Sequence, residues 1–134
     1  MKGILFWFWE FPQNLVGFII SRFANKLDSD DEMSVYIANN FFNSAVSLGE
    51  YRIADKIYKN HAVSFRKMKQ HEYGHTLQSR RFGWLYFIIV GLPSLVRNIY
   101  DRIAHKNWTN EERTKWYYGS WPENNADKLG GVRR

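Results

Sequence analysis

The sequence predicts a small α+β domain, and three stretches of the chain carry that prediction. A helix is expected from about residue 66 to residue 81, because Gly83 follows it and glycine is common just after helix ends. Short β-type stretches separated by Asn and Gly turns occupy residues 34–54, which is typical of a small antiparallel sheet. A second short helix is expected over residues 121–129, closed by a pair of glycines.

The elements before the sheet are less regular. Residues 1–26 are expected to form a separate, aromatic and amphipathic N-terminal helical segment, with its second helix opening near Pro12 and running to about residue 24. The acidic stretch over residues 27–32 is expected to be a solvated turn that links this segment to the domain over residues 33–132.

The remaining elements follow from local patterns. Residues 63–65 are expected as a last short strand before the long helix. Residues 84–104 are expected as two helical pieces with a kink at Gly91-Leu92-Pro93. The apolar run 84–90 is expected in the core, with a re-entrant membrane segment as the alternative. The tail over residues 132–134 is expected to fray.

Length and composition limit the kind of protein. At 134 residues the chain is one domain by size. Cysteine is absent, which excludes disulfides and thiolate metal ligands and fits a reducing, cytoplasmic location. The net charge of +6 favours anionic partners, but the basic residues are scattered in short pairs without a nucleic-acid-binding motif. No nucleic-acid partner is therefore expected.

The predicted helix over residues 66–81 carries His71-Glu72-x-x-His75. Residues four apart share one helix face, so both imidazoles can present a ring nitrogen to one metal ion. Glu72 lies one step round from His71 and can take a proton from a water on that metal. The pattern predicts a zinc ion (Zn²⁺) held by His71 and His75, with Glu72 as the catalytic base.

A carboxylate ligand is expected from the second helix, where Glu123 and Asp127 are four apart and share a face. Two histidines and one carboxylate are a known ligand set of catalytic zinc, so Glu123 is the expected third ligand. Asp127 is expected behind the metal, accepting the N–H of a ligand histidine and fixing its tautomer. Without the first motif, the same pair would fit the acidic start of an ordinary helix.

Four blocks of residues extend the two motifs: 71–79, 83–86, 91–94 and 121–132. Together they resemble the gluzincin branch of zinc metallopeptidases, and the longer pattern is similar to a small, little-characterised family of bacterial metallopeptidases. The resemblance covers roughly residues 45–132. It implies a zincin-like domain, a zinc cofactor, hydrolysis of peptide bonds and a peptide or protein substrate.

Other site residues are weighed by position. A third histidine would be expected at position 81 in the longer three-histidine motif, but Arg81 stands there. Tyr117 and Tyr118 could stabilise an oxyanion or could pack in the core. His61 or His105 could also bind the metal, but each is expected in an exposed loop or at a helix end. Glu111 or Glu112 could supply the carboxylate, but both are expected in the solvated polar stretch 107–115.

Two roles fit residues 1–25. The apolar run stops at Glu10 with no small-residue cleavage site after it, so no signal peptide is recognised. A span needs about 20 apolar residues, and Pro12 and Gln13 also interrupt this segment, so a membrane span is not expected. Its tryptophans and phenylalanines suit peripheral contact with a membrane surface, or an aromatic helix packed on the domain.

The expected function is zinc-dependent hydrolysis of peptide bonds. Three alternatives stay open: a catalytically silent module stabilised by zinc, a membrane-surface binding module, and a peptidase that acts on one partner protein only.

Overall fold

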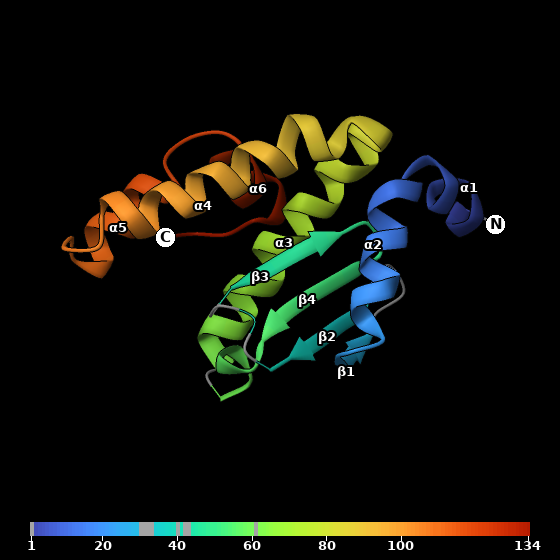
Figure 1. Ribbon diagram of the computed structural model, residues 1–134, viewed down its shortest axis with the longest axis horizontal. Helices are drawn as coiled ribbons and strands as arrows, with labels where there is room; N and C mark the ends of the chain where they lie inside the picture. The colour runs from blue at the N-terminus through green and yellow to red at the C-terminus, as the bar shows by residue number, and fades with distance from the viewer. Residues whose placement is uncertain (1, 30–33, 40, 42–43, 61) are drawn as a thin grey trace.

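The computed structural model describes residues 2–29, 34–39, 41, 44–60 and 62–134. A small sheet lies against helices, and further helices extend from one end of it (Figure 1). The predicted α+β class is confirmed. The boundary between residues 1–26 and 33–132 as separate units stays a prediction.

Four strands form the sheet: β1 (Asn25–Ser29), β2 (Ser34–Ala38), β3 (Ala45–Leu48) and β4 (Tyr51–Asp55), in the order β1-β2-β4-β3. β3 and β4 form the expected antiparallel hairpin. Gly49 sits in its turn with φ of 64°, in the left-handed region that favours glycine.

A purely antiparallel sheet is the wrong prediction, because β2 and β4 pair in parallel. β4 inserts between β2 and β3 although it follows both in the chain. Its residues 52–55 are all buried, so the central position covers this strand on both sides and both faces.

The acidic-turn prediction is wrong for residues 27–29, which belong to β1, while residues 30–33 lie outside the described part of the chain. β1 pairs antiparallel with β2. The ladder satisfies its backbone groups, and this outweighs the low strand preference of Asp and Ser.

α2 (Phe11–Ser21) and α3 (Ala62–Phe82) cover opposite faces of the sheet. On the α2 side, Gly17 lies so close to the hairpin that a Cβ there would meet the Leu48 carbonyl and the Tyr51 side chain. On the α3 side, Met68 packs with Ile37 and Ala54.

The predicted strand over residues 63–65 is wrong, because these residues form the first turn of α3. Phe65 lies three residues before Met68 and therefore on the same helix face, and both pack in the core against the sheet. Helix, rather than strand, brings both side chains to that core.

The chain between residues 83 and 104 is helical in three pieces: η2 (Gly83–Leu85), the π-helical turn η3 (Phe87–Gly91) and α4 (Leu92–Ala104). The core prediction for residues 84–90 holds for Tyr86 and Val90 only, since Trp84, Leu85 and Ile88 are exposed. The polar stretch 107–115 contains most of α5 (Asn110–Tyr117), which Thr109 and Glu112 begin as a capping box.

α1 (Lys2–Trp9) precedes α2 at a sharp bend. Among the described residues, no single helix is long and apolar enough to cross a bilayer. Residues 3–9 and 11–21 meet that length and composition only as a pair, bent by 99°.

Candidate metal centre

Two helices that are distant in sequence meet at this site: α3 and α6 (Glu123–Gly130). They pack so closely that a Cβ on Gly74 would overlap the Ala126 carbonyl, and one on Gly130 would overlap the Gln70 carbonyl. Gly74 therefore permits the close approach of the two helix backbones.

This contact brings the three predicted ligands together. His71 Nε2 lies 2.9 Å and His75 Nε2 lies 3.0 Å from the same oxygen, Glu123 Oε2. The two Nε2 atoms are 3.1 Å apart. All three side chains are buried. Nitrogen and oxygen ligands held about 2.0–2.1 Å from one tetrahedral zinc ion would lie about 3.3 Å apart, close to the spacing observed.

The outer nitrogen of His71 is fixed by Asp127, whose Oδ1 lies 2.7 Å from Nδ1. The carboxylate can only accept, so Nδ1 carries the proton. This leaves His71 Nε2 with a lone pair in the neutral ring. Asp127 thus stands where the sequence places it, behind a histidine of the motif.

His75 is oriented in the same way by Gln78, which the sequence analysis does not single out. His75 Nδ1 lies 2.7 Å from Gln78 Oε1. The Gln78 amide nitrogen donates to the Pro122 carbonyl at 3.1 Å and to Asn125 Oδ1 at 2.9 Å, which fixes the orientation of the amide. His75 Nδ1 therefore also carries the proton, and its Nε2 also offers a lone pair.

When both imidazole rings are neutral, the two Nε2 atoms and Glu123 Oε2 therefore face one another with lone pairs and with no hydrogen between them. The arrangement is repulsive unless a cation lies among the three atoms or protons are added to the rings. Burial lowers the pKa of His71, but hydrogen bonds to Asp127 and Glu123 outweigh it and raise the pKa to about 9. Two protonated rings would still place two N–H groups against each other at 3.1 Å. The cluster could hold a metal ion, which satisfies all three atoms at once.

The second oxygen of Glu123 is held by hydroxyl groups. Ser94 Oγ donates to Oε1 in a short hydrogen bond, and Tyr117 Oη donates to the same oxygen at 3.2 Å. Burial raises the pKa of Glu123, but the interactions with the neighbouring His71 and His75 outweigh it and keep the pKa well below its ordinary value. Glu123 is therefore an oriented, ionised carboxylate.

Glu72 lies beside this cluster and is buried. Burial raises the pKa of its carboxyl group, although the charges of His75 and His71 oppose that shift. Among the described residues, none hydrogen-bonds to Glu72 Oε2. A buried carboxylate oxygen without a protein partner fits a base that faces a water or substrate molecule.

The tail prediction is wrong, because Arg134 closes the outer side of the site. Its Nε donates to Asp127 Oδ2 at 2.6 Å and its Nη2 donates to Oδ1 at 3.1 Å. The guanidinium also lies 3.3 Å from the ring centroid of Tyr118, whose ring meets His71 edge-on. Two charge-assisted hydrogen bonds and one stacked ring order a segment expected to fray.

The other candidates lie away from this cluster or have other partners. His105 is buried at the end of α4, bonds to Asp101 at 3.0 Å and stacks on Trp108. Glu112 caps α5 and Glu111 is exposed on the same helix. His61 lies outside the described residues.

Sequence reasoning missed three groups that hold the predicted residues in place. Gln78 lies three residues after His75 on the same helix, so helix spacing alone could have pointed to it. Ser94 and Arg134 carry no local signal, because they reach the site only through the packing of α4 and of the chain end.

Comparison of the chain with known protein families, curated proteins and solved structures finds no match in any of the three.

Proposed function

We propose that this chain is a zinc-dependent hydrolase of peptide bonds, with His71, His75 and Glu123 as metal ligands. One observation carries the proposal: two histidines whose outer nitrogens are already committed aim their Nε2 atoms at one ionised carboxylate oxygen. Such a donor set can hold a cation, and two imidazoles with one carboxylate suit zinc.

When bound, zinc supplies Lewis-acid chemistry: it polarises a carbonyl group and lowers the pKa of water. The residues of the chain do the rest. Glu72 Oε2, buried and without a described protein partner, accepts a proton from the attacking water and passes it to the leaving amine. Its raised pKa makes the Glu72 carboxylate a stronger base than an exposed glutamate, which favours proton transfer from water.

A polypeptide substrate is favoured by the edge strand beside α3. β3 is the last strand of the sheet, and Asp55 N–H donates to the Ser44 carbonyl at 2.9 Å. Because the hydrogen-bonding side alternates along an antiparallel pair, the N–H and C=O of Ala45 point away from β4. An extended peptide can add to a strand edge through such groups.

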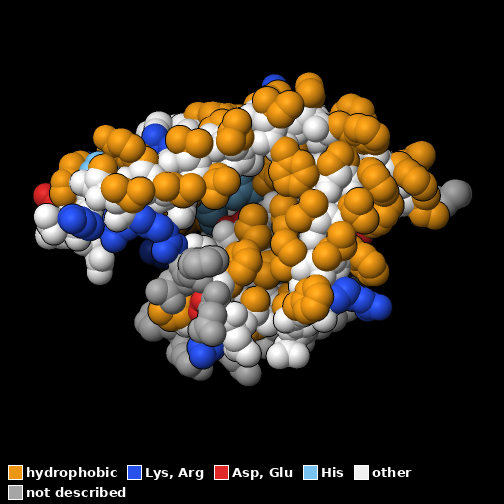
Figure 2. Space-filling model, viewed as in Figure 1, with side chains coloured by type: hydrophobic (Ala, Val, Ile, Leu, Met, Phe, Trp, Pro, Cys, Tyr) orange, Lys and Arg blue, Asp and Glu red, His pale blue; other side chains and the backbone are white. Residues whose placement is uncertain are grey.

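The same rule makes the Ser47 carbonyl point outward, and Tyr86 Oη donates to it at 3.1 Å. Figure 2 shows a hollow between α4 and the sheet, with histidine and acid atoms at its floor. A peptide paired with Ala45 would run along this hollow, past the predicted ligands.

Metal analysis and peptide hydrolysis together test the proposal. The purified protein is expected to bind one zinc ion, and Glu123→Ala is expected to lose it. Glu72→Gln is expected to retain zinc but to lose hydrolysis of a fluorogenic peptide library by at least about 100-fold. Glu111→Gln is the matched control, since Glu111 is exposed on α5.

Two results would contradict it. Zinc stoichiometry unchanged in Glu123→Ala would remove that carboxylate from the ligand set. Zinc binding with no hydrolysis by the unmodified chain would leave the silent, zinc-stabilised module as the function.

A further inference from the structure

The N-terminal helices turn their polar side chains inward. Glu10, Gln13 and Asn14 are all buried. Gln13 Nε2 donates to Ser79 Oγ at 2.9 Å and to the Gly83 carbonyl at 2.8 Å, and Ser79 Oγ donates to Glu10 in a short hydrogen bond. A surface helix of a protein surrounded by water shows the reverse arrangement, with its apolar stripe toward the core.

Apolar side chains of these helices face outward instead. Among the described residues, 24 large apolar or aromatic side chains are exposed, whereas nine apolar side chains are buried. Figure 2 shows many hydrophobic side chains on one face of the molecule, over α4 and over the N-terminal helices α1 and α2. We call this surface the apolar face, and its members include Ile4, Phe8, Ile19, Ile88, Leu95 and Ile99.

α4 follows the same rule. Leu92, Leu95, Val96, Ile99 and Ile103 are exposed at spacings of three and four residues, which places them on one stripe. Two polar residues of the helix reach into the protein instead. Ser94 donates to Glu123, and Arg97 donates to backbone carbonyls at the end of α5. The N-terminal helices and α4 therefore both expose apolar side chains and use polar side chains to contact the rest of the protein.

The tryptophans of this region favour lipid as the covering partner. Trp9, Trp84 and Trp121 are between 40% and 60% exposed. Each donates its indole N–H to a backbone carbonyl of the protein itself, at 2.8–3.0 Å. A bilayer interior offers no acceptor, so polar groups near it must be satisfied within the protein. The exposed parts of these rings are thus apolar.

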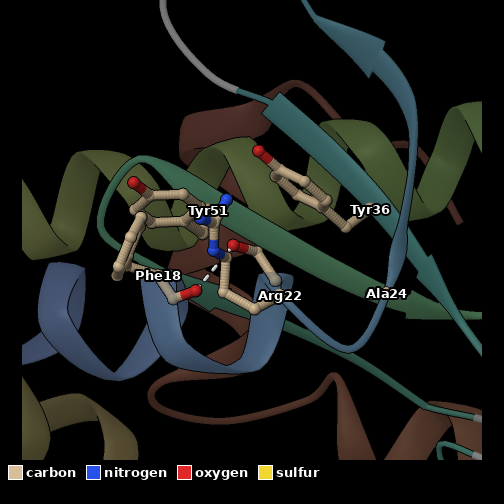
Figure 3. Close-up of a pocket in the computed structure, with 6 residues that line it drawn as sticks. Phe18, Arg22, Ala24, Tyr36 and Tyr51 are labelled. Carbon is tan, nitrogen blue, oxygen red and sulfur yellow. Dashed lines mark hydrogen bonds between the residues drawn. The ribbon is translucent and has the colours of Figure 1, made fainter.

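Positive charge lies beside the apolar face, where anionic headgroups would meet it. Arg22 follows α2, and its guanidinium lies 5.2 Å from the centroid of the Phe18 ring. Figure 3 shows it at a cavity of about 340 Å³ together with Tyr36 and Tyr51. The chain carries a net charge of +6, and basic residues next to an apolar surface attract an anionic leaflet.

We propose that the apolar face docks on an anionic lipid bilayer, with Arg22 at headgroup depth. The docking surface extends the membrane contact expected for residues 1–25 to η2, η3 and α4. Docking on a bilayer also implies that the substrates are membrane-associated polypeptides, and this second statement rests on the proposed function.

Vesicle co-sedimentation with the full chain tests the docking, using phosphatidylcholine vesicles with and without phosphatidylglycerol. The wild type is expected to sediment more strongly with the anionic vesicles. The double variant Ile4→Asp/Ile88→Asp is expected to partition at least about tenfold more weakly, because two charges enter the surface that lipid would cover. Ile4 and Ile88 are 65% and 66% exposed, so their replacement leaves the core intact.

Ile57→Asp is the matched control, because this isoleucine is 53% exposed on η1 (Lys56–Asn60), away from the apolar face. It is expected to sediment as the wild type does, and Arg22→Gln is expected to reduce the preference for anionic vesicles. Circular dichroism of each variant checks that the fold is retained.

Three outcomes would overturn the docking proposal. The first is that the double variant and Ile57→Asp sediment equally, and the second is that the wild type stays in the supernatant with both kinds of vesicle. The third is that the wild type forms a dimer without lipid and the double variant is monomeric. Glu72→Gln is expected to bind vesicles like the wild type, so loss of docking and failure of the proposed hydrolysis are read separately.

Discussion

Gly74→Ala tests the helix contact on which the proposed metal centre depends. The substitution adds one methyl group in the middle of α3, where it would overlap the backbone carbonyl of Ala126. Because the obstacle is backbone rather than a flexible side chain, α6 has to move away from α3. That movement carries Glu123 and Asp127 away from His71.

Two opposing effects set the size of the change. Alanine in a helix interior is favoured over glycine by about 1 kcal/mol. Overpacking of a close contact costs about 1–3 kcal/mol, and rigid backbone puts this site at the upper end. The net expectation is a loss of about 1–2 kcal/mol, or a fall in Tm of about 3–8 °C for a chain of this length.

Zinc affinity is expected to fall further than stability alone would suggest, by at least about tenfold, because a displaced carboxylate no longer shares one point with the two imidazoles. Thermal melts and competition with a chromophoric chelator measure the two quantities. Gly3→Ala is the control, since a Cβ there meets nothing within 4 Å and Gly3 also lies in a helix. Wild-type zinc affinity and an unchanged or higher Tm in Gly74→Ala would refute the role of this contact.

Three more predictions concern the surroundings of the site. Asp127→Asn is expected to weaken zinc binding about 10–100-fold in the same chelator competition, because an amide can donate to His71 Nδ1 and move the ring proton to Nε2; unchanged affinity would contradict this. Chelation is expected to lower the Tm of the wild type but not of Glu123→Ala, and equal shifts in both would show that the chelator acts elsewhere. Burial raises the pKa of Asp101, but hydrogen bonds from Arg113 outweigh it, so its folded pKa lies below the unfolded value. The resulting stabilisation is present above about pH 4 and is lost as the pH falls through the folded pKa. Urea unfolding of Arg113→Met should therefore differ from the wild type at pH 7 and approach it as the pH falls through the folded pKa of Asp101, and a gap that stays constant with pH would exclude this ion pair as its cause.

The site was predictable where helix periodicity decides. His71, Glu72 and His75 follow from one spacing on one helix, and Glu123 and Asp127 follow from the same spacing on another. That these two helices meet was a hypothesis from chemistry, since nothing local encodes it. The small residues that permit the contact, Gly74, Ala126 and Gly130, are visible in the sequence, but their pairing is not.

The errors share a physical cause, which is non-local contact. β4 is placed between β2 and β3 by burial rather than by its order in the chain. The tail is ordered by Arg134, which finds Asp127 and Tyr118 only once α6 is in place. The stretch 84–90 is predicted in the core because it is apolar all round, yet Trp84, Leu85 and Ile88 are exposed.

α3 connects the two proposals through adjacent residues. Gln78 orients His75 toward the metal-binding point, and Ser79, the next residue, bonds to Glu10 and Gln13 of the N-terminal segment. Residues one apart on a helix point about 100° away from each other, so one side of α3 carries the ligands and another carries the anchor of the apolar helices. Phe65 and Met68 pack the start of α3 on the sheet, but over residues 71–79 two polar faces are committed to separate partners. The position of this part of the helix therefore depends on satisfied hydrogen bonds, and a change at either polar face is expected to be felt at the other.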